Sequence, residues 1–224
     1  MKRLTYKKLF SLIVLLLGIN TIQAQDFNGR KSIGLNFFAA QTDNKEDTAY
    51  SSSSGNRGGN INVAYFLNND WQVGIGFGLN RSSNEFGSHS SNKQSGWNWQ
   101  LFARNYYWSS KKTAFFLEPA FTYQNTWIED KANNLSLSTR THRGITYELN
   151  AKLGFLYTIN QRFGVDLSFQ FIRLGYGTAN VTNAITTNGE TEEASEKITT
   201  AYFALTRGIG SIQSVSLGFK YFFK

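Results

Sequence analysis

Apolar and polar residues alternate with a period of two through most of this chain, and this pattern restricts it to β-structure. From Trp71 to Asn80, for example, Trp, Val, Ile, Phe and Leu alternate with Gln, Gly and Asn. Eight segments show the pattern: 32–39, 60–67, 71–80, 97–104, 115–124, 147–158, 163–171 and 215–223. No helical period competes with them beyond residue 25. The sequence therefore predicts an all-β fold built from eight strands.

The connections between these segments alternate between two kinds. Three are tight, namely 68–70, 108–112 and 160–162, and four are long and polar, namely 41–57, 81–95, 126–143 and 177–210. Short turns on one side and long loops on the other are typical of an up-and-down transmembrane barrel. Each segment is near the roughly 9–11 residues that a tilted strand needs to cross a bilayer. The mean hydropathy of -0.35 agrees with this, because lipid-facing and lumen-facing residues are averaged together. We therefore expect an eight-stranded antiparallel transmembrane β-barrel.

The same alternation also fits a secreted soluble barrel whose apolar side chains point inward. Three features favour the membrane barrel. Glycine on the alternate face relieves crowding inside a narrow barrel, and aromatic residues near both ends of the apolar face suggest two interfacial belts. Pro119 lies within a strand on the lipid-facing side, where we expect a bulge or one lost ladder bond. The inward glycines are Gly74, Gly76, Gly78, Gly154, Gly164 and Gly218.

The first 24 residues have the pattern of a secretory signal peptide. A basic start precedes the short apolar run 9–19, and cleavage is expected after Ala24, which leaves 25–224 as the barrel domain. A retained N-terminal anchor is the alternative. Removal of residues 1–24 lowers the formal charge from +8 to +4, with no Lys/Arg-rich run remaining, so we expect no nucleic-acid partner. The absence of cysteine excludes disulfides and thiolate metal sites.

From about Gly29 to Lys224 the chain resembles the small eight-stranded outer-membrane barrels of the OmpA transmembrane-domain and OmpX type. The resemblance rests on the alternation, the loop asymmetry, the signal peptide and the aromatic terminal strand 216–223. It implies a monomer in the outer membrane of a Gram-negative-type bacterium, surrounded by lipid and lipopolysaccharide. It also implies that the outer-membrane assembly machinery reads the terminal strand, although Lys224 follows the last aromatic residue. The resemblance is architectural and carries no functional motif.

Five charged residues share the inward parity, in the half of each strand nearest the tight turns. They are Arg104, Glu118, Lys152, Asp166 and Lys220. Arg104 and Glu118 lie on adjacent strands, and so do Lys152 and Asp166. An unpaired charge in a narrow barrel costs several kcal/mol, so we expect a packed ion-pair network that plugs the lumen. A gate or ion path is the alternative, but the lumen of eight strands is too tight for an open aqueous channel.

No catalytic, cofactor-binding or metal-binding residue is predicted. The two histidines, His89 and His142, lie in predicted loops, and Ser88 and Ser90 beside His89 reflect a serine-rich composition. The glycines of 74–78 open no helix, so they do not form a phosphate-binding loop.

The last long connection carries an acidic group beside Asn188-Gly189, a pair that suggests a hairpin tip with strands projecting beyond the membrane. We interpret Glu190, Glu192, Glu193 and Glu196 as a solvated tip rather than as a cation site. The expected function is non-enzymatic, with a structural or adhesion-like surface role through the long loops. A narrow gated pore for ions or small solutes is the alternative, and a loop-based hydrolase is a third.

Overall fold

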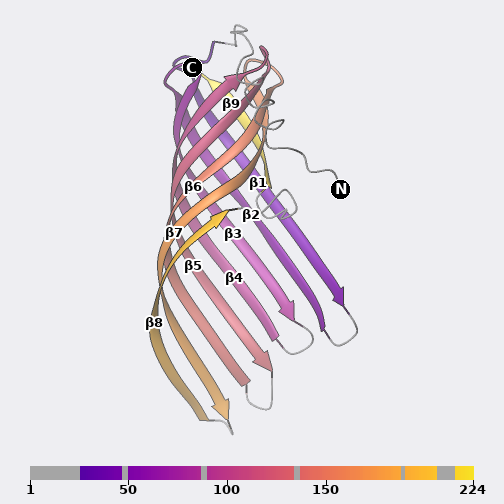
Figure 1. Ribbon diagram of the computed structural model, residues 1–224, viewed down its shortest axis with the longest axis vertical. Helices are drawn as coiled ribbons and strands as arrows, with labels where there is room; N and C mark the ends of the chain where they lie inside the picture. The colour runs from indigo at the N-terminus through magenta and orange to yellow at the C-terminus, as the bar shows by residue number, and fades with distance from the viewer. Residues whose placement is uncertain (1–25, 47–49, 87–89, 134–136, 188–189, 206–214) are drawn as a thin grey trace, which may run out of the picture.

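The computed structural model describes residues 26–46, 50–86, 90–133, 137–187, 190–205 and 215–224 (Figure 1). These ranges contain nine antiparallel strands: β1 (Lys31–Glu46), β2 (Tyr50–Phe66), β3 (Trp71–Phe86), β4 (Ser90–Trp108), β5 (Thr113–Asn133), β6 (Leu137–Thr158), β7 (Phe163–Thr187), β8 (Glu190–Leu205) and β9 (Val215–Phe223). Strands β1 to β7 pair in sequence order, and β9 lies between β7 and β1, which closes a ring of eight. The predicted all-β class and eight-stranded antiparallel barrel are confirmed. Within the described ranges, no helix has the length and hydropathy needed to span a membrane.

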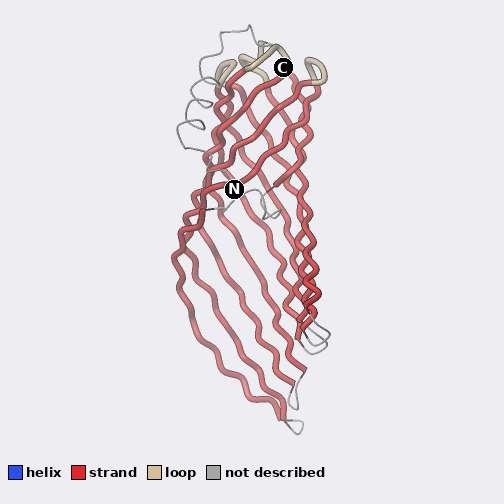
Figure 2. The backbone as a smooth tube through the Cα atoms, turned by 45° about the vertical axis from the view of Figure 1, so that its right-hand side comes forward, coloured by secondary structure: helices blue, strands red, loops and turns tan. Residues whose placement is uncertain are grey.

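Three tight turns gather at one end of the barrel, which is the upper end in Figures 1 and 2. Each turn is stabilised by a side-chain oxygen that accepts backbone N–H groups two and three residues ahead. Asn68 and Asn160 do so at 2.8–2.9 Å, and Ser110 does so at 3.0–3.1 Å. The three turns therefore form where the sequence predicts them, between β2 and β3, β4 and β5, and β6 and β7.

At the opposite end the strands continue far beyond the length of a membrane crossing. Strand β7 has 25 residues, or about 80 Å at about 3.3 Å per residue. The predicted long loops 41–57, 81–95, 126–143 and 177–210 are therefore wrong over most of their length, because these residues lie in strands. Polar composition indicated contact with water, but Ser, Thr and Asn form strands when each has a partner in register. All 16 residues of β1 have such partners in β2.

The predicted hairpin at the end of β7 agrees with the structure. Strand β7 ends at Thr187 and β8 begins at Glu190, while Asn188 and Gly189 lie outside the described residues. Figure 2 shows the strands crossing around a cylinder at the turn end and spreading at the far end. The barrel thus continues into a sheet that projects beyond its ring.

On the side away from β6, strand β7 changes partner along its length. Its first seven residues, Phe163–Phe169, pair with β9, and Ile172–Thr187 pair with β8. On the β6 side the register shifts, since Ala151 pairs with Ile172 and Lys152 pairs with Gln170. The shift leaves Phe171 as a bulge. A bulged residue reverses the in-and-out alternation that follows it, so the faces of the second half of β7 are exchanged.

Large inward-pointing side chains lie directly beside several of the predicted glycines. A Cβ on Gly74 would lie 2.5 Å from Cζ of Phe102, and one on Gly154 would collide with the ring of Phe116. A Cβ on Gly218 would meet the carboxylate of Asp166. Glycine at these positions therefore makes room for large side chains that cross the lumen, as the alternation predicts.

Pro119 interrupts one ladder without changing its register. Between β4 and β5, Phe102 pairs with Ala120 and Asn105 pairs with Leu117, but the two residue pairs between them are missing. Proline has no N–H to donate. On its other side Pro119 keeps its partner Ala151 in β6. The predicted defect is therefore a lost pairing and not a bulge.

Candidate functional site in the barrel lumen

Aromatic rings fill the lumen at the turn end. A turn at Gly29, whose φ of 72° favours glycine, directs Phe27 back into the barrel. Phe27 is fully buried and stacks on Phe66 and Trp108, with centroids 5.0 and 5.2 Å away, and it meets Phe222 edge-on at 5.0 Å. We call this cluster the aromatic plug; its rings are Phe27, Phe66, Tyr106, Trp108, Phe116 and Phe222. No sequence-based prediction identified it, because Phe27 belongs to no alternating segment.

All five predicted lumen charges meet directly beyond the plug, in what we call the charge network. The guanidinium of Arg104 donates to Oε2 of Glu118 and to Oδ2 of Asp166, each at 2.7 Å. The Nζ of Lys152 lies 3.0 Å from Oε1 of Glu118, and the Nζ of Lys220 lies 3.5 Å from Oδ2 of Asp166. Each carboxylate therefore contacts two cations, and the three cations are held by two anions.

Lys152 and Asp166 lie on adjacent strands, as the sequence predicts, but the two side chains do not meet. The register places Lys152 opposite Gln170 and Asp166 opposite Leu156, so the two charges are offset by four residues, or about 13 Å along the strands. Lys152 instead lies directly opposite Glu118 in β5. Adjacent strands correctly suggested that Arg104 and Glu118 are close to each other. Adjacency alone is not enough, however, because the register decides which charges meet.

The network is packed against the plug. The guanidinium carbon of Arg104 lies 3.9 Å from the ring centroid of Phe116, a cation–π contact of a kind worth about 2 kcal/mol when water is excluded. Tyr106 donates to Oε1 of Gln72 at 2.9 Å, and Gln72 donates to Ser32 at 2.8 Å. Four of the five charged side chains are almost completely buried, while Lys152 is 24% exposed. The plug and the network therefore obstruct the lumen together.

A second polar cluster surrounds Glu148, farther from the turns. Arg173 and Tyr202 donate to its Oε2 at 2.7 Å, and Gln170 and Asn150 donate to its Oε1 at 3.1 Å. Glu148 lies on the inward parity of β6, so the alternation could have identified it. Arg173 follows the bulge, which hides its inward direction from a parity count, and Tyr202 lies in a segment predicted as loop. This cluster joins β6, β7 and β8.

A polar cavity of about 470 Å³ lies in the lumen beside both clusters. Arg104, Glu118 and Lys152 line it, as do Glu148 and Arg173. Much of the remaining lining consists of amide and hydroxyl side chains, including Asn60, Asn80, Asn98, Thr122, Gln124 and Ser168. Such a surface can hold water or a small polar solute.

The remaining sequence candidates show no catalytic geometry among the residues described. His89 lies outside those residues. His142 lies in β6 rather than in a loop, with Nε2 3.4 Å from Oδ2 of Asp130. On β8, the exposed Glu196 lies 3.7 Å from Arg140. In the ranges given above, no group of three His, Cys, Asp or Glu residues could hold a metal ion.

No protein-family model matches the chain, and no curated protein sequence matches it. Solved structures with a similar fold include the outer membrane protein OprG from Pseudomonas aeruginosa, with a TM-score of 0.48, 11% identity, and coverage of 91% of this chain and 99% of that one. Neisserial surface protein A gives a TM-score of 0.42 with 12% identity, covering 87% and 97%. Ail of Yersinia pestis gives 0.40 with 14% identity, covering 88% and 99%. These are likenesses of fold.

Proposed function

We propose that this chain is a non-enzymatic outer-membrane barrel that anchors a projecting sheet used for surface binding. The first support is the apolar band, the outward-facing apolar side chains of the ring strands. Ile33, Ile75, Leu101 and Leu149, for example, are 41–58% exposed. Soluble monomers rarely expose apolar patches beyond a few hundred Å², whereas a barrel in lipid requires such a band.

Cations mark the end of this band away from the turns. The register pairs Arg57 with Arg81, and the same row continues through Ser95 and Trp127 to Arg143. All five side chains are exposed. Arginine and tryptophan are suited to the boundary between hydrocarbon and headgroups. The row therefore marks where the apolar face ends on these strands, and it supports a sheet that lies in water beyond it.

The obstructed lumen is the main observation that favours surface binding. The aromatic plug and the charge network fill it near the turns, so binding by the projecting sheet is favoured over transport. The second candidate, a narrow gated pore, draws on the polar cavity beside the network. Single-channel recordings of the protein and of Glu118→Ala separate the two. We expect no steady conductance from the unmodified protein, and a steady large conductance would contradict the plug.

Surface binding is tested by shortening the longest hairpin in register. Residues 178–187 pair with 190–199, so deletion of both stretches joins β7 to β8 through a new two-residue turn after Gly177. We expect cells that carry this variant to lose adhesion while the barrel still inserts. A variant with the β1–β2 hairpin shortened in the same way shows which part of the sheet contributes. Unchanged adhesion in both variants would refute a binding role for the sheet.

Membrane placement has its own test. We propose a monomer in contact with lipid and lipopolysaccharide, assembled through the aromatic strand β9. Outer-membrane fractions should contain the protein in a form whose gel migration changes on heating. Recovery as a soluble periplasmic protein would overturn the proposal. Substitution of Phe223 by Ala should lower the amount assembled, because it removes the last aromatic residue of β9.

A further inference from the structure

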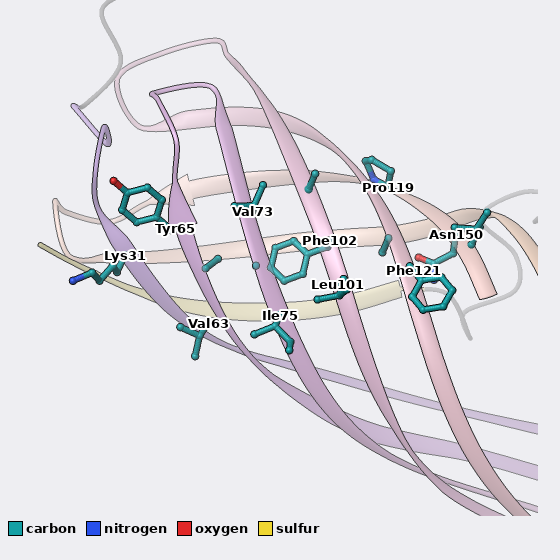
Figure 3. Close-up of a pocket in the computed structure, with 15 residues that line it drawn as sticks. Lys31, Val63, Tyr65, Val73, Ile75, Leu101, Phe102, Pro119, Phe121 and Asn150 are labelled. Carbon is teal, nitrogen blue, oxygen red and sulfur yellow. The ribbon is translucent and has the colours of Figure 1, made fainter. Parts of the chain in front are cut away.

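A shallow apolar groove of about 1040 Å³ crosses the outer face of the barrel (Figure 3). Two rows of outward-facing side chains border it, and both rows follow the register from strand to strand, except at Ala103 and Pro119, which lie at corresponding positions where the β4–β5 pairing is interrupted. The row nearer the turns is Lys31, Tyr65, Val73, Ala103 and Pro119, and the other is Val63, Ile75, Leu101, Phe121 and Leu149. Between the rows lie inward-pointing residues, among them Ala64, Phe102 and Ala120, whose backbone forms the floor. Ala103 and Pro119 are short, which leaves the space open.

The groove moves away from the turn end as it crosses the strands. Lys31 is the first residue of β1 and Tyr65 is one residue from the end of β2, whereas Ala103 is five residues from the end of β4. Pro119 is six residues from the start of β5, or about 20 Å along that strand. With a strand tilt of about 40°, this is about 15 Å of depth, half of a hydrocarbon core about 30 Å thick. The groove therefore leads from the membrane surface to the middle of the bilayer, which is the depth of one leaflet.

Lys31 places a cation at the end of the groove nearest the turns. Lys31 is exposed beside Tyr65, and Figure 3 shows both at the same end. Within the described part of the chain, no carboxylate forms an ion pair with Lys31. A free ammonium and a phenol hydroxyl at the interface, next to an apolar channel, complement an anionic headgroup joined to an acyl chain.

We propose that this groove binds one glycerophospholipid of the leaflet at the turn side, with its phosphate at Lys31 and Tyr65 and one acyl chain along Val73, Ala103 and Pro119. The proposal rests on the membrane placement proposed above. Charge and depth select the occupant. The headgroup of a lipid in the opposite leaflet would lie near the row of arginines. Its acyl chains could therefore not enter the groove from the end at Lys31.

Native mass spectrometry tests this proposal on the full-length protein extracted in mild detergent, after incubation with phosphatidylglycerol vesicles. We expect one phospholipid to be retained. Lys31→Glu should lower the retained fraction about fivefold, as expected for one interfacial cation. Ala103→Phe, which fills the groove without touching the charge, should lower it similarly.

Two matched variants control for charge and for bulk elsewhere. Lys111→Glu reverses an exposed lysine in a turn, and Leu167→Phe adds bulk to the outward face of β7. Both should retain lipid like the unmodified protein. The proposed lipid site would be refuted if both groove variants retained as much phospholipid as the unmodified protein. It would also be refuted if lipopolysaccharide alone were retained. Heat-dependent gel migration is recorded for every sample, so failure of membrane insertion is distinguished from failure of lipid binding in an inserted barrel.

Discussion

Replacement of Glu118 by Ala tests the central contact of the charge network. The change leaves Arg104, whose side chain is 4% exposed, with Asp166 as its remaining carboxylate partner in the described network. Lys152 keeps the side-chain oxygen of Gln100 at 3.3 Å and can hydrate through the polar cavity, so it adds little to the cost. Removal of one partner from a buried ion pair costs about 3–5 kcal/mol. Because Asp166 still compensates Arg104 in part, we expect the free energy of unfolding to fall by about 3 kcal/mol.

The assay is reversible urea unfolding in lipid vesicles, followed by tryptophan fluorescence and by gel migration. Glu193→Ala, an exposed position on β8, is the control and should change the free energy by less than about 0.5 kcal/mol. A double-mutant cycle with Arg104→Met isolates the pair. A loss below about 1 kcal/mol for Glu118→Ala, or strict additivity of the two substitutions, would refute the description of a packed, mutually dependent network.

Three further substitutions address other parts of the barrel. Gly154→Ala forces the ring of Phe116 to move and should lower the unfolding free energy by about 1–3 kcal/mol in the same urea assay. Pro119→Ala restores a backbone donor between β4 and β5, so stability should rise by about 1 kcal/mol and the new amide should exchange slowly with deuterium. Glu148→Gln weakens the contact with Arg173, and hydrogen exchange in β8 should become faster than in β9.

The alternation of apolar and polar residues predicts some features of this structure and leaves others undetermined. Alternation determines which residues face inward, and it therefore identified Arg104 and Glu118 as lumen residues. Alternation contains no register, so it could not predict that Lys152 meets Glu118 rather than Asp166. Alternation also could not predict the bulge at Phe171, because one extra residue reverses the two faces of the strand without changing its composition.

Two other features lie outside the pattern for different reasons. The polar halves of the strands lack apolar alternation, so only backbone pairing reveals them as strands. Phe27 precedes the first strand and packs by tertiary contact alone. Local signals therefore predicted the ring, while long-range packing produced the plug and the sheet extension.

The aromatic plug also has a consequence for the order of assembly. Phe27 packs against β2, the end of β4 and β9, so its contacts join the start of the chain to its last strand. Contacts that span almost the whole sequence form late, because other contacts must first offset the entropy of closing so long a loop. The plug can be complete only once β9 has docked between β7 and β1. The contact of Phe27 with Phe222 is therefore a marker of the final step of ring closure.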